Sequence, residues 1–196
     1  MDLGAFLGGI RTVDLLIVLY FIGFFVLGFA QGTIRRLIGI GSILFSFLFA
    51  ANLADPLGRF LGDNWTQFPR PYAYMIGFGL VFAVASIAFA LVVQTYYRPQ
   101  ELFQKARFAD EIIGGILGLL QAAIIFGSVL IILDSFFKLP GYAPDPQELP
   151  FLRDFWGGLD GSATAAAFRS TLIPDAFFLI GFLIPSNIQS LYPRAG

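Results

Sequence analysis

The stretch that decides the fold is DEIIGGILGLLQAAIIFGSVLIILD, residues Asp110–Asp134. Between its acidic ends, residues 112–133 are uncharged, and a helix of this length extends about 33 Å, which matches the roughly 30 Å core of a bilayer. The alternative is a buried helix of a soluble protein, but such a helix rarely stays apolar on every face for so long. The stretch therefore predicts a membrane-spanning helix.

The composition of the whole chain supports a membrane protein. Hydrophobic residues make up 57% of the 196 residues and charged residues only 13%, whereas soluble domains contain about 25% charged residues. A net charge of −1 gives a nucleic-acid partner no electrostatic support. The chain has no Cys and no His, which removes the commonest nucleophiles, bases and metal ligands. We expect no enzyme activity and no cofactor.

The apolar runs predict an all-α integral membrane protein with four spans, near residues 13–30, 34–54, 72–95 and 111–134. Asp2 stands where a signal peptide carries basic residues, so the first run is expected to remain as a helix. Residues 31–36 are expected to form a tight hairpin. The short second span is expected either to tilt little or to leave Arg35 and Arg36 reaching the lipid headgroups. Residues 55–71, with three prolines, are expected to form a loop. Residues 1–136 would form the membrane domain and 137–196 a separate tail.

The tail is expected to contain an interfacial helical segment rather than a fifth span. Residues 138–161 are rich in proline and predict an extended stretch. Ser162 is suited to cap a short helix to about Thr171, in which Ala165, Phe168 and Leu172 share a face. Residues 176–184, bounded by prolines, are too few to cross a bilayer. A re-entrant tail that adds a fifth span is the alternative.

Cationic residues give a weak indication of orientation. The connections after the first and third spans hold five of them, and the other side holds four. By the positive-inside rule, both termini are predicted to lie outside the cytoplasm.

Small residues form a stripe on three of the predicted spans, where they let helix backbones approach closely. One stripe is Gly114, Gly118 and Ala122. The others are residues 42, 46, 50 and 54, and residues 79, 83, 86 and 90. The stripes either pack the four spans together or bind other membrane proteins or further copies of the chain.

Three patches of this sequence resemble the colicin V production (CvpA) proteins. The first is the acid at the start of the first span, Asp14. The second is the hairpin, where the family pattern is Arg-Gly-x-x-Arg-Glu. Here Gly32 and Arg35 match, while Gln31 and Arg36 depart from the basic and acidic positions.

The third patch opens the fourth span, where the family pattern is Asp-Arg-x-x-Gly-x-x-x-Gly-x-x-Arg-Gly, followed by an apolar run that ends in Leu-Asp. The matching residues are Asp110, Gly114, Gly118, Leu133 and Asp134, and the departures are Glu111, Gln121 and Ala122. The tail around residues 169–174 is also similar to that of the family.

The resemblance implies a small, multi-pass protein of the bacterial inner membrane that supports production of a secreted peptide toxin and the integrity of the envelope. A non-enzymatic accessory protein is the first hypothesis for its activity, and an oligomeric channel or transporter is the alternative. A membrane-embedded enzyme is disfavoured, because Asp110 and Asp134 lie about 36 Å apart on one helix.

Two polar residues have open roles. Asp14 is expected to cap the first turn of its own helix, with an intramembrane site as the alternative. Gln121 lies near the bilayer midplane, where an amide needs a hydrogen-bond partner. Its expected partner is the hydroxyl of Ser42, Ser46 or Ser86 on a neighbouring helix. The bond either stabilises the bundle or marks a polar point on a solute path.

Overall fold

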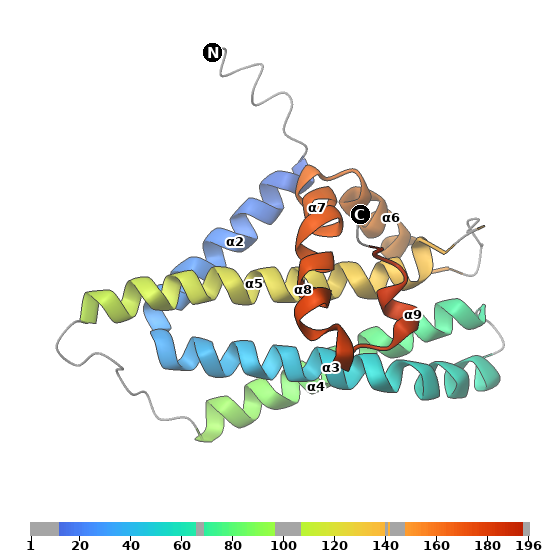
Figure 1. Cartoon of the computed structure of the whole chain (residues 1–196), viewed down its shortest axis with the longest axis horizontal. Coiled ribbons are helices and arrows are strands. Elements are labelled where there is room, and N and C mark those ends of the chain that lie inside the picture. Colours follow the sequence, from blue (N-terminus) through green and yellow to red (C-terminus); the bar gives the residue numbers. More distant parts are fainter. Residues whose placement is uncertain (1–11, 66–68, 97–106, 140, 142–147, 194–196) are drawn as a thin grey trace, which may run out of the picture.

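The computed structural model describes residues 12–65, 69–96, 107–139, 141 and 148–193, and this part of the chain contains helices and no strand (Figure 1). Its long helices are α2 (Thr12–Gln31), α3 (Thr33–Asn64), α4 (Arg70–Tyr96) and α5 (Arg107–Phe137). Each is long and apolar enough to cross a membrane. The predicted all-α, multi-pass membrane fold is therefore confirmed.

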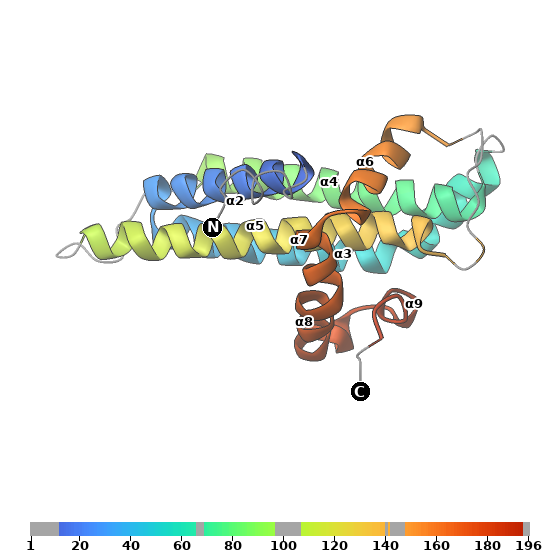
Figure 2. The same cartoon turned by 90° about the horizontal axis from the view of Figure 1, so that it is seen from above.

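The four long helices pack as two pairs, α2 with α5 and α3 with α4, and α5 joins the two pairs. Helix α2 lies on α5, helix α4 runs along α3, and α5 also contacts α3 and α4 (Figures 1 and 2). The reversal between α2 and α3 is made at Gly32 alone, whose φ of 74° is readily available only to glycine. Its N–H donates to the carbonyl of Gly28 at 3.0 Å. This tight turn places the start of α3 beside the start of α5.

The predicted loop at residues 55–71 is wrong over residues 55–64, because α3 continues to Asn64. Pro56 lies inside the helix, where its missing N–H costs a hydrogen bond and normally ends a helix. Packing against α4 offsets that cost: Gly58 lies against Tyr74, and Leu57 and Leu61 lie against Gly77. The α3–α4 contact thus extends beyond the apolar run that the sequence displays.

The tail is largely helical. Its elements are α6 (Pro150–Asp160), α7 (Ala163–Ala167), the π-helix η1 (Phe168–Leu172), α8 (Ile173–Ile180), the 3-10 helix η2 (Gly181–Leu183) and α9 (Ser186–Gln189). The predicted extended conformation is therefore wrong for residues 150–160. Ser162 caps α7 as predicted, since its Oγ accepts from the N–H of Ala165 at 3.1 Å.

The π-helix changes which tail residues face the bundle. Ala165 and Phe168, predicted to share a face, are both buried, but Leu172 is 51% exposed and Ile173 is buried in its place. A π-turn contains one residue more than an α-turn, so the buried face shifts by one position. The three-residue face predicted from α-helical spacing is therefore wrong at its last member.

The predicted number of four spans is not confirmed. Residues 163–183 form one continuous helical segment of 21 residues that is also long and apolar enough to cross a membrane. Pro174 does not interrupt it, because it occupies the first turn of α8, where a missing N–H is tolerated. In both views this segment runs across α5 rather than along it (Figures 1 and 2). Phe168 and Ile173 pack over Gly127 at the crossing.

Single-cysteine labelling decides between four and five spans, because the natural chain has no cysteine to remove. We expect Asp63→Cys and Ser190→Cys to react with a membrane-impermeant maleimide from the same side, since the tail helices run across the bundle. Arg107→Cys, at an exposed position, should react from the opposite side. Labelling of Asp63→Cys and Ser190→Cys from opposite sides would instead establish a fifth span.

Candidate functional site

Among the described residues, the most deeply buried charged group is the carboxylate of Asp134, near the end of α5, with a side chain that is 0% exposed. Its Oδ1 accepts from Trp156 Nε1 at 2.9 Å and from Arg169 Nη2 at 2.6 Å. Its Oδ2 accepts from Arg169 Nε at 2.7 Å and from Tyr192 Oη at 2.5 Å. These four residues form what we term the Asp134 cluster. It joins α5 to α6, to η1 and to the end of the tail.

Arg169 is the only cation of this cluster, and its side chain is 8% exposed. It lies in the π-helix η1 and forms a bidentate pair with Asp134, the geometry in which a guanidinium binds a carboxylate most strongly. Its Nη1 also donates to Asp160 Oδ1 at 2.9 Å. Burial, and then the negative charge of Asp134, raise the pKa of Tyr192 far above its usual range, so the phenol stays a neutral donor.

The Asp134 cluster is saturated with hydrogen bonds. A carboxylate has about four lone-pair sites, and all are used by the donors of Trp156, Arg169 and Tyr192. Asp134 therefore has no free lone pair with which to accept a proton from a substrate. The cluster holds the tail onto the bundle instead.

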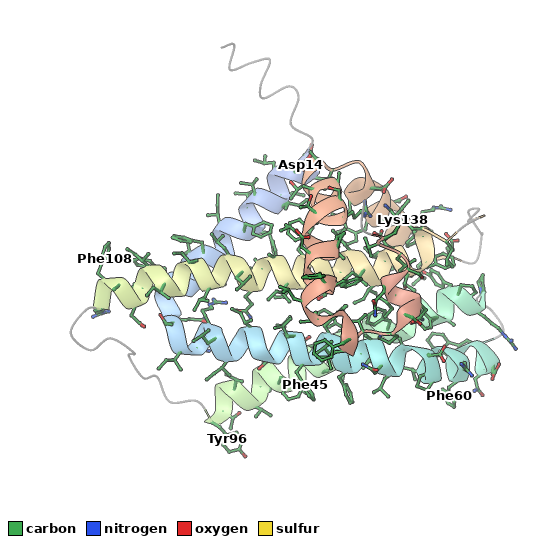
Figure 3. All side chains as sticks on the ribbon, viewed as in Figure 1. Asp14, Phe45, Phe60, Tyr96, Phe108 and Lys138 are labelled. Carbon is green, nitrogen blue, oxygen red and sulfur yellow. The ribbon has the colours of Figure 1, made fainter. Side chains whose placement is uncertain are left out.

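Asp14 anchors the tail at a second point, the start of α7. It lies in the first turn of α2, and its Oδ1 accepts from Ser162 Oγ at 2.6 Å, Thr164 N at 3.1 Å and Thr164 Oγ1 at 2.9 Å. Figure 3 shows Asp14 beside the start of α7. The predicted cap of its own helix is corrected: Asp14 binds the free N–H groups at the start of α7, about 150 residues later.

The stripe of Gly114, Gly118 and Ala122 packs against α2 within the same chain. A Cβ atom on Gly118 would clash with the backbone oxygen of Phe24, and one on Gly114 would clash with Gly28. The hydroxyl of Tyr20 donates to the carbonyl of Ala122 at 3.1 Å. This stripe therefore joins α2 to α5 and leaves no room for a helix of another protein.

Asp110, at the start of α5, is buried against the hairpin. Its carbonyl accepts from Thr33 Oγ1 at 3.1 Å, and its Oδ2 lies so close to Gly32 that a side chain there would displace it. Oδ1 of Asp110 is buried without a hydrogen-bond partner among the described residues. Two of the residues that match the family pattern, Gly32 and Asp110, are thus in direct contact.

Gln121 accepts a hydrogen bond from Arg36, with 2.8 Å between Oε1 and Nη1. The predicted serine partners are wrong, because the hydroxyls of Ser42 and Ser46 donate to carbonyls four residues earlier in their own helix. Arg36 does not reach the headgroups either: it is 5% exposed and its guanidinium lies over the ring of Phe24, 5.7 Å from the centroid.

Arg35 and Gln31 line the same cavity as Arg36 and Gln121. Arg35, which matches the family pattern, is half-buried there. Two of the positions at which the chain departs from that pattern, Arg36 and Gln121, contact each other. Sequence reasoning missed the buried position of Arg36, because a cation in a short hairpin normally faces solvent.

Gln121→Leu is expected to lower the free energy of unfolding by about 1–3 kcal/mol, because Arg36 loses a buried acceptor. Gln121→Glu keeps an oxygen at this position and adds a charge, so it should be at least as stable as the natural chain. Thermal unfolding of the purified protein in detergent measures both. Equal stability of the Leu variant and the natural chain would contradict the importance of this hydrogen bond.

Comparison with known proteins gives one family. The family model described as "Colicin V production protein" matches residues 13–174. The match includes Asp14, Asp110, Gln121, Asp134 and Arg169, whereas Tyr192 lies beyond it. Neither a curated protein nor a solved structure matches the chain.

Proposed function

Since the chain belongs to the colicin V production protein family, we propose that it is a non-enzymatic accessory protein of the bacterial inner membrane. In this role it supports production and secretion of a peptide toxin and maintenance of the cell envelope. The observation that carries the proposal is the family match itself, which runs through all four long helices and the tail to residue 174.

The chemistry of the polar clusters supports a role without catalysis. Asp134 and Asp14 each accept several hydrogen bonds from the tail. A general base needs a carboxylate that can take a proton from a substrate, and these two are committed to holding helices together.

An accessory protein also needs a surface for its partner, and α4 offers one. The stripes on α5 and on α3 are largely buried within the chain, with Ser46, Ala50 and Ala54 each 0% exposed. On α4, in contrast, Ala83 and Ala90 are exposed. We expect a helix of another membrane protein, or of a second copy, to pack there.

The experiment that tests the function is complementation in a bacterium that secretes colicin V and lacks its own member of the family. We expect the chain to restore toxin titre and to reduce uptake of a dye that an intact envelope excludes. Immunoblots of the membrane fraction must show normal abundance of the protein. Normal abundance without recovery of either readout would reject the proposal.

A channel or transporter is the second candidate function. The observation that favours it is the buried pair of Arg36 and Gln121 beside a cavity between the long helices, because polar groups inside membrane spans often line solute paths. Flux of small ions through the purified protein in liposomes distinguishes the two. Flux that Gln121→Leu abolishes at unchanged stability would favour the channel, and co-purification of a membrane partner without flux would favour the accessory role.

A further inference from the structure

A small cavity between α3, α4 and α5 has an unusually basic and polar lining. Its volume is about 170 Å³. The polar side chains that line it are Gln31, Arg35, Arg36, Ser42, Ser86 and Gln121. No acidic side chain of the described residues lines it, so two arginines face the cavity without a neutralising carboxylate.

Two buried polar atoms in this lining have no hydrogen-bond partner among the described residues, Nε of Arg36 and Oγ of Ser86. Gln121 satisfies only Nη1 of the guanidinium. Arg36 is 5% exposed, so water does not readily replace the missing partners. A buried charged donor without an acceptor is costly, and such a group in a native protein usually has a bound partner.

We propose that this cavity binds a phosphate group. Phosphate oxygens are acceptors that match the planar fork of a guanidinium. In the cavity they would accept from Nε of Arg36 and from Arg35, while the hydroxyl of Ser86 supplies a further donor. The negative charge of the ligand would neutralise two cations for which the described part of the chain places no carboxylate in the cavity lining.

The position of the cavity suggests the source of the phosphate. Arg35 and Arg36 lie in the first turn of α3, at the end of the bundle where Figure 3 shows Phe108 and Tyr96. The positive-inside rule assigns this end to the cytoplasm, and basic pockets between spans on that side are known to bind anionic lipid headgroups. The ligand is thus either the phosphodiester of an anionic phospholipid or free inorganic phosphate.

The test uses the purified full-length chain in detergent with three probes: phosphatidylglycerol, phosphatidylcholine and inorganic phosphate. Native mass spectrometry measures retained lipid, and thermal unfolding measures stabilisation by each probe. Retention of phosphatidylglycerol over phosphatidylcholine would assign the site to an anionic lipid. Stabilisation by inorganic phosphate without lipid selectivity would assign it to a soluble phosphate. The absence of both effects would overturn the proposal.

Four variants separate this site from general charge effects. Arg36→Gln should weaken binding about tenfold or more, because it removes a charge-assisted hydrogen bond. Ser86→Leu fills the cavity without changing any charge and should abolish binding. Gln121→Glu keeps the contact with Arg36 and should weaken binding by repelling the anion. Arg107→Gln removes an exposed charge at the same end and is the matched control.

The comparison of Arg36→Gln with its control Arg107→Gln is the main test. If Arg36→Gln is unstable, Gln121→Glu still tests the proposal, because it is expected to fold normally. Equal binding by Gln121→Glu and the natural chain, or equal loss in Arg36→Gln and Arg107→Gln, would overturn the proposal.

Discussion

Asp134→Ala is expected to lower the free energy of unfolding by about 3–5 kcal/mol, the usual cost of removing one member of a buried ion pair. The guanidinium of Arg169, 8% exposed, would remain in the interior with only Asp160 as a charged partner. Trp156 and Tyr192 would also lose their acceptor. Thermal unfolding in detergent measures the loss, and limited proteolysis should show that the tail is released from the bundle before the long helices unfold.

Asp160→Ala is the matched control, because it removes the other carboxylate that Arg169 contacts. The side chain of Asp160 is 44% exposed, so its loss should cost no more than about 1 kcal/mol. The double variant Asp134→Leu with Arg169→Met replaces the ion pair by apolar side chains, and it should recover much of the lost stability. If Asp134→Ala were no less stable than Asp160→Ala, the Asp134 cluster would not hold the tail.

Gly118→Leu is expected to cost about 3 kcal/mol and to separate α2 from α5. The added side chain would collide with the backbone oxygen of Phe24 and lie near the Cα atom of Gly28. A backbone cannot rotate away as a side chain can, so this overpacking should reach the upper end of the usual 1–3 kcal/mol range. Thermal stability, and crosslinking between cysteines placed on α2 and α5, measure the effect.

Gly41→Ala is the control for Gly118→Leu. Gly41 lies on α3, where an added Cβ atom would have no neighbour within 4 Å. This substitution should be neutral or should stabilise the helix by about 0.5–1 kcal/mol, because it removes the flexibility of glycine from the unfolded chain. Unchanged stability and crosslinking in Gly118→Leu would contradict the close approach of the two helices.

The long helices could be predicted from the sequence because lipid imposes a simple rule: about 20 apolar residues cross a bilayer. That rule does not predict how far a helix continues beyond its apolar run. Residues 55–64 of α3 contain Pro56 and several charges, and their packing against α4, including that of Gly58 against Tyr74, supports the helix there. The π-turn before Ile173 was equally inaccessible, because periodicity assumes 3.6 residues in every turn.

The polar residues of the clusters could be selected from the sequence, but their partners could not. Asp14, Gln121 and Asp134 were conspicuous because acids and amides are rare near apolar spans. Their partners lie far away in the chain: Ser162 is 148 positions after Asp14, and Gln121 is 85 positions after Arg36. Spacing within one helix contains no information about such pairs. One usable signal was missed: Arg169 interrupts an apolar segment, and such a cation requires a buried anion.

The two anchors of the tail have a consequence for biogenesis. The hydrogen-bond donors of Asp14, on Ser162 and Thr164, are synthesised about 150 residues after it. The donors of Asp134 on Arg169 and Tyr192 are likewise synthesised after it. Both carboxylates therefore lack these partners until the tail has been synthesised. A chain truncated before residue 162 is expected to leave Asp134 without its cation, Arg169, and Asp14 without the donors of Ser162 and Thr164.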